Sequence, residues 1–184
     1  MQAAGRAPLS DPDPDRSGSG RPRRIGTLVL TAAAVVTLDV VTKLLAVERL
    51  TDRQPVRLLG GLLRLVETRN AGAAFGLGAG ATILFTLVAA GVVVAIARTA
   101  PRLRSTAWAV CLGLLLGGAT GNLIDRLLRS PGPLRGHVVD WIQLPHWPVF
   151  NLADASIVTG GLLAVLLASR GLGVDGRRVA RTDG

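Results

Sequence analysis

The chain has 184 residues, of which 49% are hydrophobic and 18% are charged, and its formal net charge at pH 7 is +9. This composition is too apolar for a typical soluble domain and leaves room for several membrane spans. With three Phe, three Trp and no Tyr, the arginine-rich chain lacks the aromatic side chains that a base-stacking surface needs, so we expect no nucleic-acid partner.

Residues 1–24 are rich in Pro, Gly, Ser, Asp and Arg and cannot bury a core, so they are predicted to form a disordered cytoplasmic tail. The apolar run that follows, residues 25–47, is longer than the apolar segment of a secretory signal peptide. It is interpreted as an uncleaved first membrane span.

Four apolar runs approach the roughly 20 residues that a helix needs to cross the hydrocarbon of a bilayer. None shows the alternating pattern of barrel strands, so a bundle of helices is expected. The sequence predicts an all-α membrane protein of four transmembrane helices in one domain, residues 25–170, followed by a cytoplasmic tail at 171–184. The predicted spans are 25–47, 78–98, 106–127 and 150–169.

The arginines predict how the chain crosses the membrane. Four spans place both termini on one side, and residues 1–24, 98–104 and 170–184 together carry twelve arginines, against eight in segments 48–77 and 126–149. Because cytoplasmic loops are enriched in Lys and Arg, both termini are expected in the cytoplasm. The outer segment 56–76 is unusually apolar for a loop, and it predicts short strands or an amphipathic platform on the membrane surface.

Asp39 and Lys43 are four residues apart in the first span and therefore share one helix face. One interpretation is a mutual ion pair that serves packing. The other is that either side chain orients an outer loop or a lipid headgroup, because ionisable residues within spans are often functional.

Asn122, Asp125 and Arg126 occupy positions i, i+3 and i+4 near the end of the third span and also share a face. Asp125 has Arg126 beside it in the sequence and is expected to pair with a nearby cation. An architectural role and a direct chemical role both remain open for this group.

Asp140 and Asp154 form the candidate catalytic pair. The neighbours of Asp140 in VVDWI are apolar, so burial is expected to raise its pKa. Asp154 lies three residues after Asn151, which is placed to cap the fourth helix or to hydrogen-bond the carboxylate. The two aspartates are close enough in sequence to meet at the outer membrane surface, share one proton and hydrolyse a peptide bond by general acid–base catalysis.

A non-enzymatic membrane protein, such as a transporter subunit or an assembly scaffold, is the alternative, with the aspartates as ion-pathway or packing residues.

Two further features concern packing. Gly113, Gly117 and Gly121 recur every four residues and predict a close helix contact, and Cys111 is expected to be a buried thiol.

Five motifs together resemble the lipoprotein signal peptidases, also called signal peptidase II, a family of bacterial membrane aspartic proteases. They occur in the family's order, across residues 27–170. The motifs are DVVTK at 39–43, TRNAGAAFG at 68–76, GNLIDR at 121–126, VVDWI at 138–142 and FNLADAS at 150–156.

The resemblance implies four spans in the bacterial inner membrane, a small extracytoplasmic β-like cradle and an active site near the outer face. It implies cleavage of diacylglyceryl-modified prolipoproteins just before the lipidated cysteine, with membrane lipid around the enzyme and with no cofactor or metal. We expect a monomer. The resemblance assigns catalysis to Asp140 and Asp154, and substrate binding or support to Asp39, Lys43, Asn70, Gly72, Asn122, Asp125, Arg126, Asn151 and Ala153.

Overall fold

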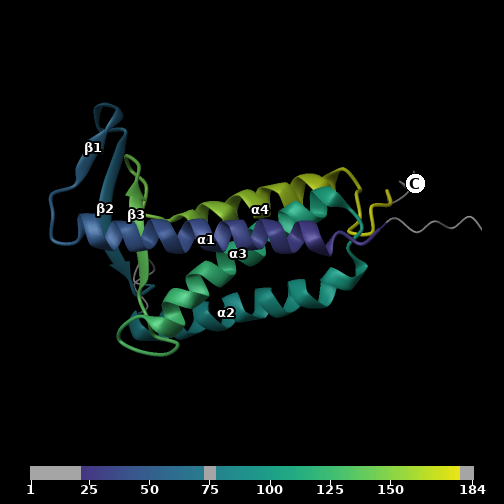
Figure 1. The fold of residues 1–184 in the computed structure, drawn as a ribbon, viewed down its shortest axis with the longest axis horizontal. Helices are drawn as coiled ribbons and strands as arrows, with labels where there is room; N and C mark the ends of the chain where they lie inside the picture. Colours follow the sequence, from purple (N-terminus) through teal and green to yellow (C-terminus); the bar gives the residue numbers. More distant parts are fainter. Residues whose placement is uncertain (1–21, 73–77, 179–184) are drawn as a thin grey trace, which may run out of the picture.

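The computed structural model describes residues 22–72 and 78–178, and Figure 1 shows a bundle of long helices with a small sheet across one end. The predictions for residues 1–21, for the 73–76 part of the TRNAGAAFG motif and for residues 179–184 lie outside the described residues.

The four helices are long and apolar enough to cross a membrane. A 3₁₀ turn, η4 (Ala100–Arg102), joins the second to the third. The predicted four-helix membrane bundle with a small β element is therefore confirmed. The helices are α1 (Ile25–Leu50), α2 (Gly78–Thr99), α3 (Thr106–Leu128) and α4 (Leu152–Ser169).

Helix α3 is the centre of the bundle and packs against α1, α2 and α4. Its most apolar stretch is 44% buried inside the protein, against 11–22% for the other three helices, and its mean hydropathy of 1.6 is the lowest of the four. A helix surrounded by protein can hold polar side chains that a lipid-facing helix cannot. The polar motif near its end, GNLIDR, is therefore placed inside the bundle.

The glycine repeat of α3 is where α1 approaches it. A Cβ on Gly113 would lie 2.7 Å from Thr31 Cβ, and one on Gly117 would lie 2.6 Å from Val35 Cβ. The third glycine, Gly121, faces Asp39, whose Oδ2 would be 2.6 Å from an added Cβ. Small residues at this spacing let two helix backbones approach closely. The predicted close contact is confirmed, and it brings the polar residues of α1 against α3.

The sheet has the order β1-β2-β3, and both pairs of strands are antiparallel. A 3₁₀ turn, η2 (Leu59–Gly61), joins the first two strands. The outer segment predicted to form short strands thus contributes two of them. The strands are β1 (Val56–Leu58), β2 (Leu63–Asn70) and β3 (Val138–Gln143).

The chain turns back after β3, and this return positions the start of α4. Phe150 pairs with Ile142, with hydrogen bonds of 2.9 Å in both directions between their backbones. Asn151, the next residue, is consequently brought beside Asp140 of β3. In β2 the register shifts between Leu65 and Thr68, and beyond the shift Thr68 pairs with Asp140.

At the opposite end of the bundle, α1 begins and α4 ends (Figure 1). The chain after α4 turns onto the start of α3, where Trp108 donates its Nε1–H to the Leu172 carbonyl at 2.6 Å. The Val174 carbonyl accepts from the backbone N–H groups of Arg104 and Ser105 at 2.9 and 3.1 Å. Residues 171–178 therefore pack on the bundle.

Candidate active site

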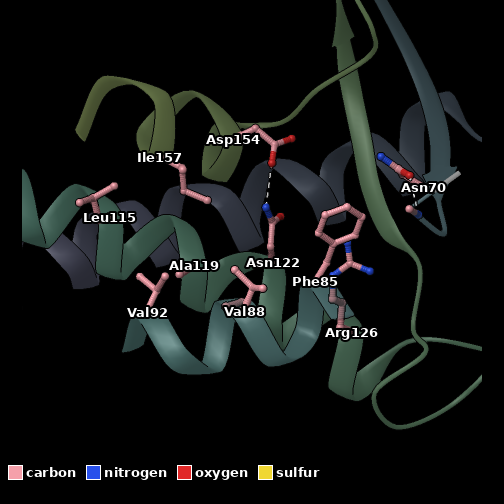
Figure 2. A pocket seen from close by; sticks show the side chains of 12 residues that line it. Asn70, Phe85, Val88, Val92, Leu115, Ala119, Asn122, Arg126, Asp154 and Ile157 are labelled. Carbon is pink, nitrogen blue, oxygen red and sulfur yellow. Dashed lines mark hydrogen bonds between the residues drawn. The ribbon is translucent and has the colours of Figure 1, made fainter. Parts of the chain in front are cut away.

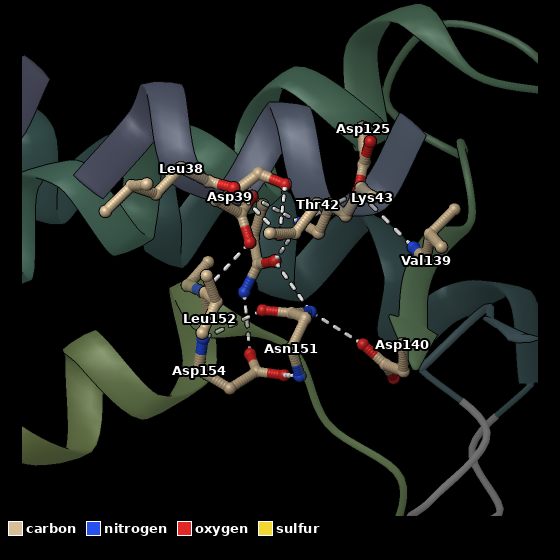
Figure 3. Close-up of polar contacts among 12 residues, drawn as sticks. Leu38, Asp39, Thr42, Lys43, Asp125, Val139, Asp140, Asn151, Leu152 and Asp154 are labelled. Carbon is tan, nitrogen blue, oxygen red and sulfur yellow. Dashed lines mark hydrogen bonds and ion pairs between the residues drawn. The ribbon is translucent and has the colours of Figure 1, made fainter. Parts of the chain in front are cut away.

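The sheet end of the bundle holds a cluster of polar side chains that come from separate parts of the chain (Figure 3). Helix α1 supplies Asp39 and Lys43, α3 supplies Asn122 and Asp125, β3 supplies Asp140, and the start of α4 supplies Asn151 and Asp154. Most of these residues are fully buried, so each charged or amide group needs a partner within the protein.

Lys43 joins α1 to α3. Its Nζ lies 2.7 Å from Asp39 Oδ2 and 2.9 Å from Asp125 Oδ2, and it donates to Asn122 Oδ1 at 3.1 Å. The Lys43 side chain is only 1% exposed. A buried ammonium is tolerated when carboxylates surround it, so the predicted Asp39–Lys43 ion pair is part of a larger network.

Asp39 and Asp125 also hold backbone groups. Asp39 Oδ1 accepts from the Ala153 N–H at 2.9 Å, which ties α1 to the first turn of α4. Asp125 Oδ2 accepts from the Val139 N–H at 3.3 Å, and its Oδ1 pairs with the Arg129 side chain. The cations that neutralise Asp125 are thus Lys43 and Arg129.

The amide of Asn122 is oriented by its neighbours. Its Oδ1 accepts from Lys43 and, at 3.3 Å, from Asn151 Nδ2, so the carbonyl oxygen faces two donors. Its Nδ2 is then directed at Asp154 and donates to Oδ1 at 2.8 Å. Asn122 therefore connects the buried Lys43 ammonium of α1 with the Asp154 carboxylate of α4 through hydrogen bonds.

Asn151 caps α4 and contacts both candidate carboxylates. Its Oδ1 accepts from the Asp154 N–H at 2.9 Å, and its own N–H donates to Asp154 Oδ2 at 3.2 Å, which completes a capping box. Its Nδ2 donates to Asp140 Oδ1 at 2.6 Å. Asn151 therefore does both things that its position predicted, and the two aspartates are linked through it.

Asp140 is 2% exposed, and its burial near Asp154 disfavours a negative charge on its carboxyl group. Burial raises its pKa to about 6, and the nearby charge of Asp154 acts in the same direction. Hydrogen bonds from Asn70 and Asn151, with the charge of Lys43, oppose this shift only in part. The expected upward shift is confirmed, and Asp140 is a carboxyl group able to hold a proton near neutral pH.

Asn70, at the end of β2, completes the surroundings of Asp140. Its Nδ2 donates to Asp140 Oδ2 at 3.0 Å, and its Oδ1 accepts from the Gly72 N–H at 2.7 Å. Gly72 has a φ of 88°, a conformation that residues with a side chain rarely adopt. The glycine allows the turn that fixes the Asn70 amide.

A cavity of about 330 Å³ opens beside this cluster, between α2, α3 and α4 (Figure 2). Asp154, Asn122 and Asn70 line its polar part. Arg126 lies there too, its guanidinium carbon 5.7 Å from the centre of the Phe85 ring. Arg126 is 8% exposed, and its buried Nη1 has no hydrogen-bond partner among the described residues. The apolar lining residues are Gly72, Phe85, Val88, Ala89, Val92, Leu115, Ala119 and Ile157.

The residues singled out in the sequence are brought together at this end of the bundle. The sequence interpretation missed Arg129, although its spacing of four from Asp125 on one helix was a usable signal. It also missed Phe85, Leu115 and Ile157, because apolar residues of a membrane helix look alike whether they line a cavity or face lipid. Within the described ranges, no group of three or more His, Cys, Asp or Glu side chains is placed to hold a metal ion.

Four membrane-crossing helices that enclose carboxylates and amides beside an apolar cavity define a class of protein, the integral membrane enzymes. The family model for signal peptidase (SPase) II matches residues 31–170. The chain therefore belongs to the signal peptidase II family, as its five motifs predicted.

Similar proteins agree in sequence and in fold. A lipoprotein signal peptidase of Mycolicibacterium smegmatis is 52% identical over 174 residues, which cover 93% of this chain and 74% of that protein. One from Streptomyces coelicolor is 51% identical over 154 residues, 84% of this chain and 76% of that protein. A solved bacterial membrane enzyme shares the fold with a TM-score of 0.71 at 29% identity, over 81% of this chain and 96% of that one.

Proposed function

We propose that this signal peptidase II is an aspartic endopeptidase in which Asp140 and Asp154 carry the chemistry. Its activity is the removal of the signal peptide from diacylglyceryl-modified prolipoproteins, by cleavage just before the lipidated cysteine. The observation that supports the aspartic assignment is the position of Asn151, which hydrogen-bonds both carboxylates, one of which, Asp154, lines the apolar cavity.

The two aspartates differ in a way that suits general acid–base catalysis. Asp140, with a pKa of about 6, starts with a proton that it donates to the oxygen of the scissile carbonyl. Asp154, which accepts N–H groups at both oxygens, takes a proton from the attacking water. The water oxygen bonds to the carbonyl carbon, and a tetrahedral intermediate with two hydroxyl groups forms.

The intermediate collapses by the reverse transfers. Asp154 gives its proton to the nitrogen of the lipidated cysteine as the C–N bond breaks, and Asp140 recovers a proton from one hydroxyl group. The signal peptide leaves with a new carboxyl group, and the lipoprotein keeps a new amino terminus. Both aspartates end in their starting states, so the cycle needs no cofactor.

The remaining polar residues act by positioning. Lys43, neutralised by Asp39 and Asp125, fixes the Asn122 amide so that its N–H₂ faces Asp154. Asn70 and Asn151 hold Asp140, and the Ala153 N–H anchors the first turn of α4 on Asp39. Arg126 has a buried Nη1 at the cavity wall, which suits a donor to a carbonyl of the bound substrate.

The cavity suits a substrate that is held in the membrane. Its walls are the apolar faces of α2, α3 and α4, and its polar part is at the sheet end of the bundle. A lipid-tethered peptide would place its apolar part along these helices and its scissile bond near Asp154. We place this end at the outer membrane face and both termini in the cytoplasm, as the arginine distribution favours. The enzyme is expected to act as a monomer, with residues 25–170 as its peptidase domain.

The experiment is cleavage of a diacylglyceryl-modified precursor by the purified full-length protein and by two variants, Asp140→Asn and Asp154→Asn. Each variant is expected to lose cleavage by at least a hundredfold, because the amide can neither give nor take the proton at that step. Asp175→Asn, at the other end of the bundle, is the matched control and should cleave normally. Full cleavage by either active-site variant would reject the aspartic assignment.

A further inference from the structure

The hairpin formed by β1, η2 and β2 presents a patch of exposed leucines that the cleavage reaction does not use. Leu59 is 75% exposed, Leu62 is 64% exposed and Leu58 is 40% exposed. All three lie at the turn of the hairpin, within five residues of one another. A cluster of apolar side chains of this kind is unfavourable in water and marks a surface that meets lipid or another apolar partner.

The backbone at this turn is also held in an unfavourable shape. Leu59, Gly60 and Gly61 have φ values of 49°, 67° and 96°. The two glycines adopt such values readily, but the left-handed region is strained for a leucine. The strained residue, Leu59, is also the most exposed leucine of the hairpin, so a contact outside the protein would offset the strain.

The two strands bring like charges together next to the leucines. Arg57 and Arg64 are direct partners in the β1–β2 pairing, and both side chains are exposed. Like charges placed opposite each other weaken an antiparallel pair. The nearest acid in β2, Glu67, pairs with Arg69 at 2.9 Å. An anion bound between the two guanidinium groups would turn this repulsion into a stabilising contact.

The arrangement of sheet and helices shows which partner is near. The strands run across the helix axes at one end of the bundle, and the hairpin extends past the helices (Figure 1). Helices that span a membrane lie along its normal, so strands that cross them lie along its surface. The hairpin turn therefore lies over the lipid that surrounds the helices.

We propose that the hairpin turn docks into the membrane leaflet at the sheet end of the bundle, with an anionic phospholipid as its partner. Leu58, Leu59 and Leu62 enter the boundary between headgroups and acyl chains, and Arg57 and Arg64 bind the headgroup phosphate. The contact anchors β2, whose last residue, Asn70, donates to Asp140. This inference does not depend on the aspartic mechanism.

The test measures the depth of spin labels on the full-length chain in lipid bilayers. Cys111, which is fully buried, is replaced by serine, and single cysteines are introduced at Leu62 and Leu59. Label positions are compared by their accessibility to oxygen and to a water-soluble nickel complex. Leu30→Cys, at a 73% exposed position of α1, is the lipid reference, and Arg53→Cys, in the loop before β1, is the aqueous reference. The labels at residues 59 and 62 should resemble the Leu30→Cys label, with high accessibility to oxygen and low accessibility to the nickel complex. Accessibilities equal to those of the Arg53→Cys label would overturn the docking.

The charge assignment has its own measurement. In bilayers containing phosphatidylglycerol, the Leu62 label should lie deeper than in neutral phosphatidylcholine bilayers, and 0.5 M salt should reduce the difference. Arg57→Gln with Arg64→Gln should abolish the dependence on phosphatidylglycerol. Arg53→Gln with Arg49→Gln, which removes two nearby exposed charges, is the matched control and should preserve it. Equal depth in both lipids, or loss of the dependence in the control alone, would overturn the phosphate contact.

Discussion

Asn151 donates its Nδ2 to Asp140 Oδ1 at 2.6 Å, across the turn that joins β3 to α4. The same residue donates its backbone N–H to Asp154 and caps the helix with its side-chain oxygen. Because one residue contacts both carboxylates and starts the helix, the geometry of the pair is fixed by helix capping.

The first prediction concerns activity against pH. If Asp140 must be protonated to act as the acid, kcat/KM should fall as pH rises through its pKa of about 6. Bound substrate removes more water from the site, which disfavours the charged form further, so the fall in kcat should lie at a higher pH than the fall in kcat/KM. Both profiles can be measured with a lipidated peptide in detergent micelles.

Asn70→Ala supplies the control for this assignment. The Asn70 amide donates to Asp140 and lowers its pKa, so loss of the amide should move the alkaline fall to higher pH. A profile that keeps its midpoint in this variant, or that moves to lower pH, would show that the titrating group is not Asp140.

The second prediction concerns stability against pH. The pKa of Asp140 is about 6 in the folded protein and 3.8 when unperturbed, so the folded state binds the proton more tightly. The contribution of Asp140 to stability is therefore fully present below pH 4 and is lost as pH rises through 6, by about 3 kcal/mol at most. Asp140→Asn removes this penalty. Because asparagine also loses one of the two acceptor oxygens, the comparison is the change with pH: the Tm of the variant minus that of the parent should be larger at pH 8 than at pH 4. A difference in Tm that is the same at both pH values would contradict the account.

The residues of this site show how far the sequence alone could predict it. The Asp39–Lys43 pair follows from their spacing, and the cap at Asn151 follows from its distance to Asp154. Such contacts are local, and the helix geometry that creates them is the same in every protein. The membrane bundle was predictable for a similar reason, because the length and apolarity of a span follow from the thickness of the bilayer.

Contacts between distant segments were not predictable in this way. Asp125 was expected to pair with a cation, but the sequence offered Arg126, whereas the structure pairs it with Lys43 of α1 and with Arg129. Adjacent residues of a helix point in different directions, and a partner on another helix leaves no pattern in the sequence. Likewise, direct contact between the two carboxylates was the simplest expectation, and the placing of Asn151 between them depends on the Phe150–Ile142 pairing.

The third prediction concerns the buried Lys43 network. Lys43→Met leaves Asp39 and Asp125 close together without their shared cation, so it should destabilise the protein by about 3–5 kcal/mol. Adding Asp39→Asn removes one of the stranded charges and should recover part of the loss. Thermal unfolding of both single variants and the double variant in detergent gives the coupling energy.

An exposed pair is the comparison for this network. Glu48 and Arg49 are 67% and 69% exposed and lie 3.5 Å apart, so Glu48→Gln should change stability by less than about 1 kcal/mol. Additive effects of Lys43→Met and Asp39→Asn would show that the two groups do not interact and would refute the network.

The fourth prediction concerns the contact between α1 and α3 that brings Lys43 to Asn122. In Gly117→Ala the new Cβ would lie 2.6 Å from Val35 Cβ and 2.9 Å from the Ala32 carbonyl oxygen, so the helices must separate. Overpacking of this kind costs about 1–3 kcal/mol, and cleavage should fall with stability because the Lys43–Asn122 bond is stretched. Gly91→Ala is the matched control, since its Cβ position on α2 meets no atom within 4 Å among the described residues, apart from its chain neighbours and the nearby backbone of its own helix. Gly117→Ala should show a lower Tm and slower cleavage than Gly91→Ala. Equal Tm values and cleavage rates in the two variants would mean that the glycine repeat does not set the distance between the helices.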